Sequence, residues 1–287
     1  MRHRLVTLLL LSCGTAAAQE AAPGEIRRPV LELGLIGGGG YVPDYPAADQ
    51  GRLRGIIAPF LIYRGDFFRS DDQGARLRAF HNDVAEFSLS ASGSFPASSD
   101  HNDARRGMPD LDWLGEIGPT LRLTLWRDSD PAQPRRILLE TPVRAVFSTD
   151  FTSISHRGFT FAPELAFEAG GFALPNARLR AGIGVTFGDH RFMDYFYGVA
   201  PEFARPDRPA YGARAGYLGA RASFSYRVPV TERLSVVAGA RVEYFGGAAN
   251  RDSPLFRQDW NISVAAGFSW SIWRSEAMAG ARDDPFD

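Results

Sequence analysis

Apolar and polar residues alternate along many segments of this chain. In residues 234–244 every second residue from Leu234 is apolar, and most of the intervening positions are Arg, Ser, Gly or Glu. The same alternation recurs in residues 121–125, 159–168 and 178–187. A strand with one apolar and one polar face has this period of two. Because segments of roughly ten residues repeat it between turn-forming clusters, we expect an all-β fold, a transmembrane antiparallel β-barrel of the outer-membrane type.

The pattern also predicts where the strands lie. We expect them at residues 31–41, 55–64, 84–95, 113–126, 136–148, 158–168, 177–187, 213–227, 233–245 and 259–273. Residues 64–80 and 192–199 are candidates for a further pair, which gives about ten to twelve strands, and bacterial single-chain barrels use even numbers. Residues 229–232 form a short turn, whereas residues 98–112, 200–210 and 246–258 are long and polar. Short turns normally face the periplasm and long loops the exterior.

The N-terminus predicts export. A basic start (residues 1–4), an apolar run (5–11) and small residues (14–18) predict a signal peptide over residues 1–18, cleaved after Ala18. The alternative is lipoprotein processing at Cys13. No later stretch is apolar enough for a transmembrane helix. Together with the strands, this predicts a location in the outer membrane, with membrane lipid as a partner.

The domain organisation follows from these assignments. We expect a linker at residues 19–29, one barrel at 30–273 and a polar, disordered tail at 274–287. Aromatic residues fall near the predicted strand ends, as in the two interfacial girdles of membrane barrels. Residues 263–272 resemble the terminal strand that outer-membrane assembly machinery recognises.

Composition excludes several kinds of chemistry. The 287 residues contain one cysteine, Cys13, in the segment expected to be removed, so disulfides, zinc-thiolate sites and cysteine nucleophiles are excluded from the mature chain. There is no lysine, so Gly37 to Gly40 cannot form a Walker A loop and no Schiff base can form. The net charge is -1 and no basic face stands out, so we expect no nucleic-acid partner.

Histidines are the remaining candidates for chemistry. His81 and His101 each begin a His-Asn-Asp tripeptide, which offers imidazole and carboxylate ligands for a metal. Both tripeptides lie in turn-rich stretches where Asn and Asp are favoured for backbone reasons, and we favour that interpretation. His156 and His190 are candidate bases of a hydrolase, but no serine has a nucleophile-elbow context. We therefore expect no catalytic residues, no metal and no cofactor.

Charged side chains on the polar faces are expected to point into the lumen. If they pair across it, a barrel of this size is filled; if arginines stay unpaired, a narrow pore would favour anionic solutes. Both signs occur in similar number, which favours pairing. The lumen-facing candidates are Arg122, Glu140, Arg144, Glu164, Glu168, Arg178, Arg180, Arg221, Arg241 and Glu243.

Several loosely defined motifs, in a characteristic order, resemble the MltA-interacting protein (MipA/OmpV) family of outer-membrane proteins. They are Pro43-Asp44-Tyr45-Pro46, the stretch from Gly107 to Pro119, Tyr195-Phe196-Tyr197-Gly198-Val199, Pro209-Ala210-Tyr211, the strand from Gly216 to Val228 and Asp252-Ser253-Pro254-Leu255. Ala47 stands where a glycine is common in the family. The resemblance implies a scaffold that brings a lytic murein transglycosylase and a murein synthase together, while other members are described as porin-like. It carries over no catalytic residues.

We therefore expect a non-catalytic outer-membrane scaffold for a murein (peptidoglycan) hydrolase and synthase in the cell envelope. The first alternative is a narrow, porin-like channel for small solutes, and the second is a lipid-modifying barrel enzyme. The sequence leaves the oligomeric state open.

Overall fold

The computed structural model describes residues 29–64, 68–71, 74–128, 130 and 133–278. The expected signal peptide, the linker up to residue 28 and the tail from residue 279 lie outside the described residues. No helix within the described part is long and apolar enough to cross a membrane.

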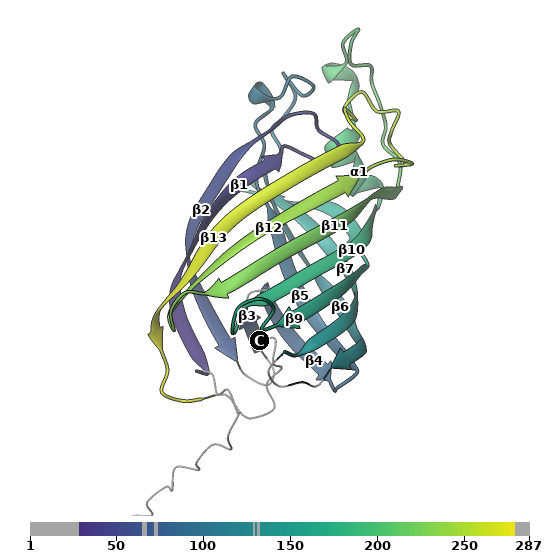
Figure 1. The fold of residues 1–287 in the computed structure, drawn as a ribbon. Coiled ribbons are helices and arrows are strands. Elements are labelled where there is room, and N and C mark those ends of the chain that lie inside the picture. Colours follow the sequence, from purple (N-terminus) through teal and green to yellow (C-terminus); the bar gives the residue numbers. More distant parts are fainter. Residues whose placement is uncertain (1–28, 65–67, 72–73, 129, 131–132, 279–287) are drawn as a thin grey trace, which may run out of the picture.

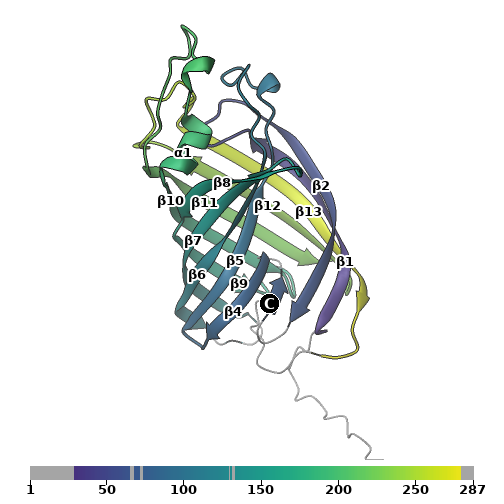
Figure 2. The same cartoon turned by 180° about the vertical axis from the view of Figure 1, so that it is seen from behind.

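One antiparallel sheet of thirteen strands makes up most of the described chain. The sheet closes on itself because β1 pairs along its length with β13, and Figures 1 and 2 show the resulting barrel. The expected β-barrel fold is therefore confirmed. The strands are β1 (Leu31–Pro43), β2 (Gly51–Arg64), β3 (Phe68–Asp71), β4 (Gly74–His81), β5 (Ala85–Ser94), β6 (Trp113–Asp128), β7 (Arg135–Thr149), β8 (Ile154–Phe161), β9 (Glu164–Gly170), β10 (Arg178–Gly188), β11 (Gly216–Pro229), β12 (Leu234–Tyr244) and β13 (Trp260–Arg274).

The strand predicted at residues 158–168 is divided into β8 and β9. Both pair with β7 on one side and with β10 on the other, so the two share one place in the ring. Because β8 and β9 together occupy the position of one strand, the thirteen described strands form a ring of twelve strand positions. This number lies within the predicted range of ten to twelve strands. The break falls at Ala162 and Pro163, because proline has no N–H to donate to the ladder.

The strand considered for residues 192–199 is wrong, because this segment contains the helix α1 (His190–Tyr197). Asp189 caps the helix, and its side chain accepts a hydrogen bond from the backbone N–H of Phe192 at 2.9 Å. Four side chains at helical spacing are buried: Phe192, Met193, Phe196 and Tyr197. On β8, Gly158 has a φ of +100°, and a side chain there would collide with the Asp189 carboxylate. The N-terminal capping of α1 by Asp189 therefore requires glycine at position 158.

The outside of the barrel is apolar. Leu53, Ile57 and Ile183 are 82%, 76% and 61% exposed, values that a water-soluble core strand would not show. Trp126 and Trp273, near the ends of β6 and β13 at one rim, and Trp260, at the start of β13 at the other, are also exposed. A wall of this kind suits contact with hydrocarbon between two headgroup layers.

One stretch of the wall departs from a complete ladder. β2 pairs with β1 along its length, but with β3 only at Tyr63 and Arg64. Within the described residues, no strand pairs with the other edge of β2 between Gly51 and Ile62 (Figure 2). Pro59 lies in this stretch, which agrees with the confinement of proline to strand edges.

The main apolar core lies in the loops at one end, not inside the barrel. We call residues 44–50, 95–112, 189–215 and 245–259 the cap. It lies at the upper rim in Figure 1, while β1 begins and β13 ends at the lower rim. Tyr45, Leu111, Met193, Tyr197 and Leu255 are among its buried side chains. The cap also contains the 3-10 turns η1 (Ser99–His101) and η2 (Pro201–Phe203).

Candidate functional site

Charged side chains from five strands meet in the lumen. We call this group the lumen network: Arg122, Arg136, Glu140, Glu164, Glu168, Arg180 and Arg221. Arg180 on β10 is its centre, with Nη2 2.8 Å from Glu140 Oε2 and 3.0 Å from Glu164 Oε1, while Nη1 donates to Glu168. One cation from one strand therefore binds carboxylates from two others, β7 and β9.

Further arginines extend the network on each side. Arg122 on β6 approaches Glu140 at 2.7 Å, and Arg221 on β11 approaches Glu164 at 3.0 Å. Arg136 approaches Glu168 at 2.6 Å, and both side chains are almost fully buried. Removing such charges from water is compensated only when each is paired and hydrogen-bonded, which this geometry provides. The network therefore crosslinks five strands and fills this part of the lumen.

The network unites six of the sequence-derived candidates and adds one. Arg136 was missed because Arg135 precedes it, and only the strand register decides which of two adjacent arginines points inward. Arg144 forms a separate group with Glu116 at 3.6 Å and with the hydroxyls of Ser90 and Ser92. Arg178 begins β10 opposite Arg227, outside the network as defined above.

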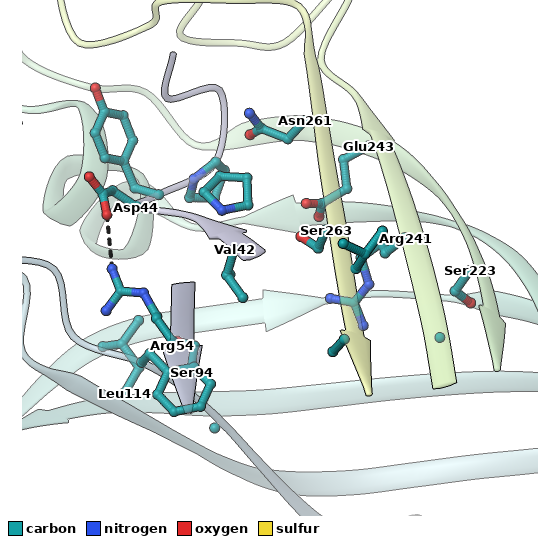
Figure 3. A pocket seen from close by; sticks show the side chains of 18 of the residues that line it. Val42, Asp44, Arg54, Ser94, Leu114, Ser223, Arg241, Glu243, Asn261 and Ser263 are labelled. Atoms are coloured by element: carbon teal, nitrogen blue, oxygen red, sulfur yellow. Dashed lines mark hydrogen bonds and ion pairs between the residues drawn. The ribbon is translucent and has the colours of Figure 1, made fainter. Parts of the chain in front are cut away.

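The last two candidates, Arg241 and Glu243 on β12, line a cavity between the network and the cap. Its volume is about 620 Å³. Glu164 and Arg180 of the network belong to its wall, and Phe192 and Phe196 of α1 line it from the cap. Figure 3 shows Arg241 and Glu243 pointing into this space.

A buried carboxylate fastens the cap to the barrel. Asp44, directly after β1, accepts hydrogen bonds from Arg52 Nε at 2.9 Å, Arg54 Nη2 at 2.9 Å and Asn102 Nδ2 at 3.1 Å. Its side chain is completely inaccessible to water. Arg54 also donates to the carbonyl of Pro96, so the two loops 44–50 and 95–112 are held to the same strand.

Hydrogen bonds then connect the cap loops to one another. The Tyr45 hydroxyl donates to the carbonyl of Leu255 at 2.8 Å, and the Tyr197 hydroxyl donates to that of Pro46 at 2.9 Å. The Ser253 hydroxyl donates to the carbonyl of Tyr197 at 2.7 Å. Burial raises the pKa of both tyrosine hydroxyls, so they stay protonated as donors. The backbone N–H of Asp112 donates to the Tyr195 hydroxyl at 2.7 Å. Four motifs that are far apart in the sequence, containing Asp44, Asp112, Tyr197 and Ser253, therefore meet in the cap.

The two candidate bases, His156 and His190, lie beside arginines. His156 Nδ1 contacts Arg191 Nη1 at 3.2 Å, not a serine hydroxyl. His156 and His190 line a cavity of about 670 Å³ on the cap together with Arg105, Arg157 and Arg191. Among the described residues, no three His, Cys, Asp or Glu side chains are grouped as metal ligands. The asparagine of the second His-Asn-Asp tripeptide, Asn102, belongs to the Asp44 cluster.

Family comparison agrees with these motifs. The family model described as MltA-interacting protein MipA matches residues 34–272, which span nearly the whole barrel. The chain belongs to this family. In this MipA family member, the match includes β2 to β12, most of β1 and β13, the complete lumen network and the cap.

More remote comparisons add context. The MipA family chain is similar to a bacterial polysaccharide outer membrane secretin (11% identity, 86% of this chain and 99% of that chain, TM-score 0.39). It is also similar to OprB of Pseudomonas putida (10% identity, 85% of this chain and 94% of that chain, TM-score 0.35). A third similar structure is outer membrane phospholipase A from Escherichia coli (10% identity, 88% of this chain and 99% of that chain, TM-score 0.31). Similarities this remote assign no function. No curated protein sequence matches the chain significantly.

Proposed function

We propose that this chain is a non-catalytic β-barrel of the outer membrane that links a murein hydrolase, a lytic transglycosylase, to a murein synthase. The observation that carries the proposal is the obstructed lumen: the cap covers one end, and the ion pairs around Arg180 cross the interior below it. The family is named for interaction with MltA, which supports a transglycosylase as one partner.

An obstructed barrel favours a role for its surfaces. The long cap loops lie at the rim opposite to the start of β1 and the end of β13 (Figure 1), and in barrels of this type the short turns face the periplasm. The turn between β11 and β12, with Thr231 and Glu232, is therefore placed towards the murein layer in this proposal. Partner contacts are expected at such turns and not at the cap.

Site-specific photocrosslinking tests the scaffold role. With p-benzoylphenylalanine in place of Glu232, irradiation of cells is expected to yield an adduct that mass spectrometry identifies as a lytic transglycosylase. The matched control places the same residue at Glu202, which is exposed in the cap. Equal capture of the transglycosylase from both positions contradicts the proposal. The proposal is also contradicted if the transglycosylase is captured neither from these two positions nor from any other periplasmic turn.

A narrow channel for small solutes is the second candidate. It is favoured by the cavity of about 620 Å³, into which the exposed Arg241 side chain points. If the scaffold proposal is right, the folded barrel in a planar bilayer is expected to show no stable single-channel steps, because the cap and the network obstruct the lumen. Regular steps that change when Arg241→Ala is introduced would favour the channel instead.

A further inference from the structure

The cavity beneath the cap contains two charged side chains that form no ion pair with another residue the structure describes. Eight charged side chains line it, and six of them have ion-pair partners. The paired residues are Asp44, Arg54, Asp112, Glu116, Glu164 and Arg180. Arg241 and Glu243 have neither an ion pair nor a side-chain hydrogen bond with any residue that the structure describes.

The two residues lie on one strand and share its inner face. Two residues along a strand separate their Cα atoms by about 7 Å, and both side chains point into the cavity (Figure 3). Arg241 lies between Ser223 on β11 and Ser263 on β13 in the ladder, and both serines also line the cavity. The cavity therefore offers a cation flanked by two hydroxyl groups.

The two ladder neighbours of Glu243 form their hydrogen bonds with other residues. Its ladder partner Arg221 binds Glu164 and also donates to the Thr186 hydroxyl at 2.8 Å. Its other ladder partner, Asn261, accepts from the N–H of Ala47 and donates to the carbonyl of Ala48. Glu243 thus faces the cavity as an acceptor to which no described side chain donates.

A ligand with both charges would satisfy this arrangement. An anion alone would pair with Arg241 and place a second negative charge near Glu243. A cation alone would pair with Glu243 and place a second positive charge near Arg241. Pairing is especially favourable where the protein partly excludes water, since an unpaired charge there is costly. A ligand with an ammonium and a carboxylate group complements both side chains at once.

We propose that this cavity binds a small zwitterion of the amino-acid class. The carboxylate binds Arg241, with the hydroxyls of Ser223 and Ser263 beside it, and the ammonium group donates to Glu243. The volume of about 620 Å³ is within the range of small-molecule sites and leaves room for a short side chain against Leu114 and Phe196. The proposal goes beyond the scaffold role and does not depend on it.

Calorimetric titration of the purified, folded barrel in detergent tests the charge requirement. L-alanine is the probe, and propionate, n-propylamine and N-acetyl-L-alaninamide each lack one or both charges. We expect saturable binding of L-alanine and at least about tenfold weaker binding of the other three, because each lost charge-assisted hydrogen bond weakens binding by about this factor. Absence of saturable L-alanine binding, or equally tight binding of propionate or propylamine, overturns the proposal.

Variants test which residues provide the two charges. Arg241→Gln and Glu243→Gln are each expected to weaken L-alanine binding at least about tenfold. The exchanged pair Arg241→Glu with Glu243→Arg is expected to bind L-alanine more tightly than either single variant, because the ligand can reverse its orientation. Arg233→Gln and Glu232→Gln, which change exposed charges in the turn before β12, are the matched controls and should bind like the parent protein.

Folding of each variant is verified by its thermal transition, and the ligand series on the unaltered barrel decides the question if a variant does not fold. Unchanged binding in both single variants would overturn the assignment of the site. The crosslinking experiment at Glu232 does not report on the cavity, so the scaffold role and the zwitterion site fail independently.

Discussion

Glu168→Ala is expected to lower the free energy of unfolding by about 3–5 kcal/mol, among the largest effects of any single substitution in the barrel. Glu168 lies between Arg136 and Arg180, and its side chain is 4% exposed. Its removal leaves the Arg136 guanidinium, 2% exposed, without the carboxylate at 2.6 Å that neutralises it. Urea-induced unfolding in lipid vesicles, followed by tryptophan fluorescence, measures the change.

Two further variants give this prediction its controls. Glu168→Gln keeps the size of the side chain and removes only the charge, so a large effect there identifies electrostatics and not a cavity as the cause. Glu202→Ala removes an exposed carboxylate and is expected to change stability by less than about 0.5 kcal/mol. A loss below about 1 kcal/mol in Glu168→Ala would mean that the network contributes little to stability.

The barrel could be predicted from the sequence because its main determinant is local. A strand with one apolar and one polar face has a period of two wherever it occurs, so β12 and β13 end within a residue of the predicted bounds. The break between β8 and β9 was also visible as Pro163, but alternation on both sides of it concealed the interruption. The local alternation of apolar and polar residues therefore predicts the strands of the barrel wall, but not the interruption between β8 and β9.

Contacts that join distant segments could not be predicted in the same way. The residues Arg180 and Glu140 are 40 positions apart, and their contact depends on the ring order and register of three strands. Aromatic residues favour strands by their intrinsic preference, and α1 contains Phe192, Phe196 and Tyr197. The helix forms there because Asp189 caps its N-terminus and because these side chains are buried under the loops. The family motifs of the cap were recognised as sequence, whereas their contacts around Tyr45 and Tyr197 required the structure.

The two halves of the lumen differ in a way that bears on function. Around Arg180 the charges are paired across strands, so this part resembles a structural core. Around Arg241 the charges face a cavity, so this part resembles a binding site. A single barrel can therefore be closed to general diffusion and still hold a small molecule beneath its cap.

Asp44→Ala is expected to release the cap from the barrel rim. It removes the carboxylate that binds Arg52, Arg54 and Asn102, and it leaves the mostly buried Arg54 guanidinium without an anionic partner. Breaking a buried pair of this kind costs about 3–5 kcal/mol, and we expect the loss to fall first on the loops 44–50 and 95–112, since the sheet has its own ladder. The loop 95–112 should then be cleaved by added protease while the strands stay protected.

The variant Asp100→Ala provides the matched comparison. Asp100 lies in the same loop, in η1, but is exposed and takes no part in the Asp44 cluster, so its removal should leave protease resistance unchanged. Mass spectrometry of the cleavage products locates the opened segment. If Asp44→Ala is cleaved no faster than Asp100→Ala, the cap is held by its apolar core around Tyr197 and Leu255 and not by the carboxylate; if the strands are cleaved as well, cap and barrel unfold as one cooperative unit.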